Sequence, residues 1–69
     1  MGELMMVSIN YYEWDKTHIA SFGNISHRPI PGDYVSINGV IYKVEKVFIK
    51  YDIYGNSVNE IFNVFVSKW

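Results

Sequence analysis

The residues best suited to chemistry are two histidines and a few carboxylates, and their spacing matches no catalytic or metal-binding pattern. His18 and His27 lie nine residues apart, and the chain has no cysteine to complete a zinc-ligand set. Asp15 or Asp33 could act with His18 in proton transfer. Both aspartates, however, occupy turn-forming stretches, where such side chains usually accept backbone N–H hydrogen bonds. We therefore expect structural roles for these residues, with no metal and no cofactor.

The serines and glycines also give no support for catalysis. None of the six serines lies in a Gly-x-Ser-x-Gly turn, and no glycine-rich phosphate loop occurs. The sequence therefore predicts a protein that is not an enzyme.

Lysines alternate with an aromatic residue in one segment. If one extra residue sits at Glu45-Lys46, then Lys46, Phe48 and Lys50 share the outward face of a strand, with Lys43 further along. Single-stranded nucleic-acid binders use such rows, because bases stack on rings while ammonium groups neutralise phosphates. The simpler interpretation is that Phe48 packs under a loop and the lysines keep the strand soluble. The net charge of −1 favours that simpler interpretation.

The C-terminal segment carries a second candidate surface. As a strand, residues 58–69 would direct Ile61, Phe65 and Trp69 away from the core-facing residues Phe62 and Val64. A strand that is apolar on both faces needs a cover for its second face. We therefore predict that Ile61, Phe65 and Trp69 form a protein interface, with a second copy of the chain or with another protein. The alternative is that this face is covered within one molecule.

Composition bounds the kind of protein that can carry these features. The 69 residues are 49% hydrophobic and 17% aromatic, which fits a single small domain over residues 1–69 whose twelve aromatic side chains build the core. No apolar run approaches the roughly 20 residues of a membrane-spanning helix, and the first residues do not resemble a signal peptide. We expect a cytoplasmic protein without a membrane partner.

Alternation and turn signals predict five strands. Residues 4–12 alternate, with Val7, Ile9 and Tyr11 on one face, and residues 17–22 form a second run that stops at Gly23-Asn24. Asn38-Gly39 joins residues 33–37 to a strand that starts at residue 40, in the dipeptide that most strongly favours a type I′ hairpin. A bulge at Glu45-Lys46 would restore the alternation and bend that strand as a small barrel requires.

Residues 58–69 fit two structures. Apolar residues fall at helical spacing, and Ser57 with Glu60 resembles a capping box. Against a helix, the segment is rich in β-branched and aromatic residues and has no alanine or leucine. We favour a strand, paired antiparallel with residues 40–52.

The pattern as a whole resembles an SH3-like small barrel. Residues 31–39 (PGDYVSING), followed by Tyr42, Val44 and Val47, are similar to strands in small-barrel proteins of phages and other mobile elements, including head–tail connector proteins. The resemblance covers about residues 29–50 and implies an all-β, five-stranded barrel or a strongly bent antiparallel meander. We expect a protein-interaction or assembly module that associates with itself or with a protein partner; the alternative is a small single-stranded nucleic-acid-binding barrel.

Overall fold

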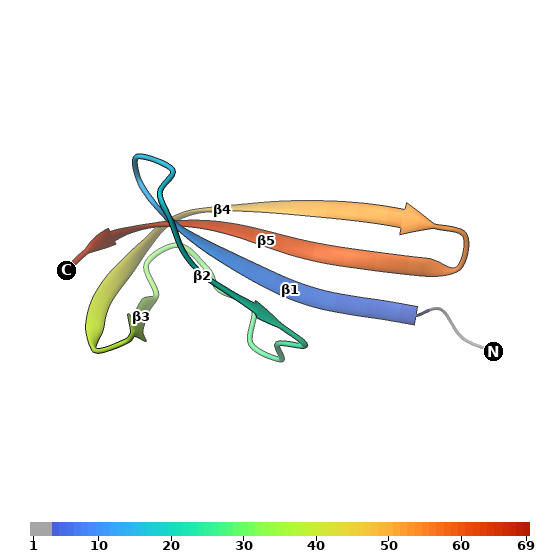
Figure 1. Cartoon of the computed structure of the whole chain (residues 1–69), viewed down its shortest axis with the longest axis horizontal. Coiled ribbons are helices and arrows are strands. Elements are labelled where there is room, and N and C mark those ends of the chain that lie inside the picture. Colours follow the sequence, from blue (N-terminus) through green and yellow to red (C-terminus); the bar gives the residue numbers. More distant parts are fainter. Residues whose placement is uncertain (1–3) are drawn as a thin grey trace.

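The computed structural model describes residues 4–69 as one five-stranded sheet, without a helix among them (Figure 1). The strands are β1 (Leu4–Glu13), β2 (His18–Gly23), β3 (Tyr34–Ile37), β4 (Val40–Tyr54) and β5 (Ser57–Lys68). Their order in the sheet is β2-β1-β5-β4-β3. Nothing in this part of the chain is a helix of the length and apolarity needed to cross a membrane.

The C-terminal segment is the central strand of the sheet. β5 pairs in parallel with the whole length of β1, from Leu4 opposite Ser57 to Glu13 opposite Val66, and antiparallel with β4. The strand prediction for residues 58–69 and its pairing with β4 are therefore confirmed, and the helix alternative is wrong. β5 is not an edge strand, because β1 and β4 flank it on both sides.

The sheet is bent into a small SH3-like barrel that is nearly closed. Its parallel β1–β5 pair excludes the purely antiparallel meander. The inner face holds the core, in which alternate residues of the three longest strands are buried: Ile9, Tyr11, Tyr42, Val44, Phe62, Val64 and Val66. β2 and β3 form the two edges, and residues 24–33 connect them across the inner face.

Two turns follow directly from their residue types. Asn38 and Gly39 have φ values of 52° and 79°, as a type I′ turn requires, so the predicted hairpin is confirmed. Pro31-Gly32 forms the other turn, closed by a 3.1 Å hydrogen bond from the Asp33 amide to the Ile30 carbonyl. Gly32 has a φ of 96°, which a residue with a side chain adopts only with strain.

The connecting segment 24–33 is fastened to the sheet by backbone hydrogen bonds. The Gly32 amide donates to the Val44 carbonyl at 2.9 Å, and the Val44 amide donates to the Asp33 carbonyl at 2.8 Å. Further along the segment, the Ile25 amide donates to the Val7 carbonyl at 3.3 Å. These bonds hold the segment over one part of the inner face only.

The end of β4, the start of β5 and the start of β1 project beyond the rest of the sheet (Figure 1). We call this three-stranded projection the arm. It consists of residues 49–61, which are the end of β4, the following turn and the start of β5, together with the start of β1. The radius of gyration is 13.0 Å, compared with about 11 Å for a compact domain of this length. The arm therefore makes the molecule elongated, with extents of 44 × 20 × 18 Å.

Candidate functional site

A bulge places the basic and aromatic residues of β4 on the outer face of the sheet. Val44 lies opposite Val66 and Lys46 lies opposite Phe65, which leaves Glu45 as the extra residue. The predicted bulge is therefore confirmed. Beyond it, Lys46, Phe48 and Lys50 share the outer face.

Four rings gather on this face, where β1, β5 and β4 run side by side. We call Tyr12, Trp14, Phe48 and Phe65 the aromatic cluster. Phe65 lies at its centre: Tyr12 is stacked on it at 5.6 Å with an interplanar angle of 26°. Phe48 and Trp14 meet Phe65 edge to face, at 5.7 Å and 6.3 Å between ring centroids. Phe48 remains 55% exposed, so it does not pack under the long loop.

The cluster borders an open pocket of about 500 Å³. Its walls combine rings, an ammonium group and an amide, from Tyr12, Lys16, Phe48, Asn63 and Phe65. Lys16 reaches this position from the β1–β2 turn, where its φ is 74° and its amide donates to the Glu13 carbonyl at 2.8 Å. A smaller hollow of about 190 Å³ continues toward Trp14 and Lys46.

A row of polar side chains crosses the sheet beside the aromatic cluster. The Asn10 amide donates to Asn63 Oδ1 at 3.1 Å, and the Ser21 hydroxyl donates to Asn10 Oδ1 at 2.7 Å. His18 Nε2 lies 2.7 Å from the same hydroxyl. This row fixes the side chain of Asn63 at the rim of the pocket.

The charge around the pocket is positive. Lys46 Nζ lies 5.7 Å from the centroid of the Trp14 ring, a cation–π distance. Within residues 4–69, neither Lys16 nor Lys46 forms an ion pair. The carboxylates of this face are engaged elsewhere: Asp52 lies 3.7 Å from Lys50 Nζ, and Glu45 accepts a 2.9 Å hydrogen bond from Ser67.

The three residues predicted as a protein interface lie on the outer face but do not form one patch. Phe65 belongs to the aromatic cluster. Trp69 is 78% exposed and meets Tyr34 edge to face at 5.8 Å, near β3. Ile61 borders a separate hollow beside Met6 and Asn59. Their role in a protein interface stays a prediction. It now concerns three separate places on the outer face instead of one patch.

Lys43 also lies apart from the pocket. It is paired with Ser67 on one side and with Tyr34 on the other. Of the four nucleic-acid candidates, Phe48 lines the pocket and Lys46 lines the adjoining hollow, while Lys50 lies two residues beyond Phe48 on β4 and Lys43 lies apart.

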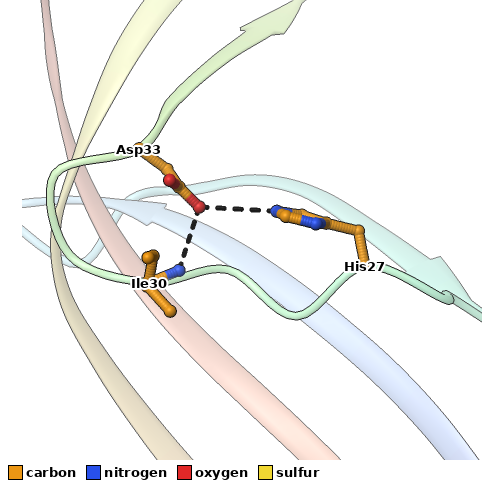
Figure 2. Close-up of polar contacts among 3 residues, drawn as sticks. All are labelled: His27, Ile30 and Asp33. Carbon is orange, nitrogen blue, oxygen red and sulfur yellow. Dashed lines mark hydrogen bonds and ion pairs between the residues drawn. The ribbon is translucent and has the colours of Figure 1, made fainter.

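The histidines and aspartates have local partners. Asp33 Oδ2 accepts a 3.1 Å hydrogen bond from the Ile30 amide and lies 3.4 Å from His27 Nε2 (Figure 2). Asp15 Oδ1 accepts a 3.0 Å hydrogen bond from the Thr17 amide, and hydrogen bonding to Thr17 lowers the pKa of Asp15. The described part of the chain contains no group of three side chains suited to holding a metal ion.

A second exposed surface lies on the inner face of the arm. Ile49, Tyr51 and Ile53 alternate along β4 on the core-facing side, yet all three are exposed. Opposite Tyr51 lies Glu60, which is only 4% exposed. Arg28 reaches Glu60 from the connecting segment, whereas the row of Ile49, Tyr51 and Ile53 beside it stays exposed.

Several site residues could not be chosen from the sequence. The alternation of residues 4–12 places Tyr12 and Asn10 on the outer face, but it does not show that β1 lies beside β5. The only usable signal is that both segments direct aromatic and amide side chains outward. Comparison with protein-family models, curated proteins and solved structures finds no match for this chain.

Proposed function

We propose that this chain is a non-enzymatic assembly module that associates with a second copy of itself through the inner face of the arm. The observation that carries the proposal is the apolar row of Ile49, Tyr51 and Ile53, which continues the core of the barrel but stays exposed within residues 4–69. Two layers are the minimum by which a sheet buries an apolar face.

A second copy is a suitable partner because the arm is self-complementary. Two arms related by a twofold axis would each supply the same apolar row, and so build a two-layer sandwich. Burial of each side chain contributes about 1.5–3 kcal/mol before the entropy of association is subtracted. The three side chains are 51–68% exposed in one copy, so each gains part of that contribution when a second arm covers it.

The central position of β5 also favours association through faces. Its backbone N–H and C=O groups are already paired on both sides, so a partner cannot add to β5 as a further strand. Association that involves this strand must therefore use side chains. A phage or mobile-element origin remains a proposal based on the resemblance of residues 29–50.

Ile53 and Tyr54 provide a matched test of this interface. The two residues are adjacent on β4 and equally exposed, at 68%, but they belong to opposite faces of the arm. Sedimentation equilibrium should show a dimer for the wild-type chain and for Tyr54→Asp, and a folded monomer for Ile53→Asp. A monomeric wild type at high micromolar concentration would contradict the proposal, as would equal dissociation by the two variants.

A further inference from the structure

We propose that the outer-face pocket binds the bases of single-stranded nucleic acid, a function separate from assembly through the arm. The pocket of about 500 Å³ joins three chemical groups that such a ligand requires: rings for stacking, cations for phosphates, and an amide for base edges. These groups come from β1, β4, β5 and the β1–β2 turn, so only the folded sheet brings them together.

Phe48 is the ring available to a base. Tyr12 already stacks on Phe65, whereas Phe48 stands almost perpendicular to Phe65, at 89°, and keeps 55% of its surface exposed. A flat base can therefore stack on Phe48 while its edge approaches Phe65. Stacking of this kind accepts every base, because each base has a π face.

The ammonium groups without an ion-pair partner in the described part of the chain lie beside the stacking ring, where the phosphates of a bound strand would lie. Lys16 lines the pocket, and Lys46 lies beside it above Trp14; neither forms an ion pair within residues 4–69. Lys50, two residues beyond Phe48, is not one of these groups, because its ammonium group lies 3.7 Å from Asp52. Since the carboxylates Asp52 and Glu45 are engaged by neighbouring groups, the pocket rim is complementary to an anion.

Asn63 supplies hydrogen bonds for the edge of a base. Its Oδ1 accepts from Asn10, which sets the orientation of the amide, and an asparagine amide has two N–H donors as well. Ser21 and His18 extend the same row and hold Asn10 in place. The donor group of Asn63 is therefore held at the pocket before any ligand arrives.

The charge and the amide favour nucleic acid over a protein segment. A purely apolar peptide would leave Lys16, Lys46 and Asn63 without partners in the complex, and an unpaired buried polar group costs about 1–3 kcal/mol. A nucleotide strand satisfies the rings, the cations and the amide together. The net charge of −1 does not prevent this, because the residues that line the pocket and the adjoining hollow include Lys16 and Lys46 and no carboxylate.

Fluorescence anisotropy with fluorescein-labelled oligo(dT) and oligo(rU) tests the proposal on the full chain. We expect the wild type to bind at micromolar concentration with an affinity that falls as salt rises. Phe48→Leu keeps an apolar side chain but loses the ring, and should weaken binding at least about fivefold. Lys46→Gln should reduce the slope of log affinity against log salt by about 0.7.

Two control variants match these changes. Tyr34→Leu removes an equally exposed ring, 56% against 55%, that lies outside the cluster, and it should leave affinity unchanged. Lys68→Gln removes an exposed lysine that lines neither the pocket nor the hollow beside Lys46. Circular dichroism confirms that each variant is folded before its affinity is interpreted.

Three results would overturn the proposal. The first is an absence of binding by the wild type. The second is equal weakening by Phe48→Leu and Tyr34→Leu. The third is binding that Phe48→Leu leaves unchanged, combined with full competition by heparin. Heparin has charge but no bases, so it should displace the labelled oligonucleotide less well than unlabelled oligonucleotide does. Because none of these variants touches the arm, the outcome is independent of the assembly experiment.

Discussion

Arg28 places its Nη2 atom 2.9 Å from Oε1 of Glu60, and so joins the segment between β2 and β3 to the inner face of the central strand. The approach is not aligned as a hydrogen bond, and Glu60 Oε1 has no hydrogen-bond partner among the described residues. The carboxylate depends on the nearby guanidinium charge for compensation, because it is almost fully buried.

Removal of Arg28 should therefore destabilise the fold although this side chain is largely exposed. We expect Arg28→Ala to lower the free energy of unfolding by about 1–3 kcal/mol, because it removes the cation beside a buried carboxylate, which then keeps, within residues 4–69, only its hydrogen bond with Tyr51. Arg28→Ala combined with Glu60→Gln should recover much of that loss. Urea denaturation measures both variants, and equal stability of Arg28→Ala and the wild type would show that water satisfies Glu60.

The Asn38-Gly39 turn should be sensitive to a side chain at its second residue. Gly39 has a φ of 79° with open space around it, so an added methyl group causes backbone strain without a clash. We expect Gly39→Ala to destabilise the protein by about 1–2 kcal/mol. Gly23→Ala is the matched control, since Gly23 has similar open space without a left-handed φ, and it should change stability little. Thermal or urea unfolding distinguishes the two, and equal losses would contradict a type I′ turn.

Stability should fall in alkaline solution because of Tyr11. Burial raises the pKa of Tyr11, and the negative charge of Asp33 raises it further. A pKa that is higher in the folded state stabilises the fold below the unfolded value of about 10, and this contribution is lost as the pH rises above that value. As the pH rises through this range, Tyr11→Phe should therefore lose less of its free energy of unfolding than the wild type does.

Urea denaturation between about pH 8 and about pH 11 measures this difference in slope. Tyr51→Phe provides a comparison, because a hydrogen bond to the Glu60 carboxylate raises the pKa of Tyr51 as well. Parallel stability curves for Tyr11→Phe and the wild type would show that Tyr11 does not contribute to the alkaline loss.

Local features of the fold could be predicted because they depend on neighbours in sequence. Asn38-Gly39 specifies its own turn, and the change of phase after Val44 reveals the bulge. The same change of phase places Lys46 and Phe48 on the outer face. These predictions need only the period of a strand and the conformations that Asn and Gly accept.

Features that depend on strand order could not be predicted. Alternation shows which residues share a face, but it does not show which strand lies alongside. The stacking of Tyr12 on Phe65 therefore appears only once β1 is known to run parallel to β5. Alternation also assigns Ile49 and Tyr51 correctly to the inner face. It does not reveal that both side chains stay exposed there.

The parallel pairing of β1 with β5 has a consequence for the order in which the protein can fold during synthesis. β1 leaves the ribosome before the other four strands, but β5, with which it pairs in the folded sheet, is the last of the five to be made. Until β5 emerges, Ile9 and Tyr11 lack the side chains of Phe62 and Val64 against which they are buried. β1 can form only its hairpin with β2, and two-stranded hairpins are marginal in water. Cooperative folding must therefore wait for release of the C-terminal strand, so a chain stalled before residue 58 should be open to proteases and chaperones along its whole length.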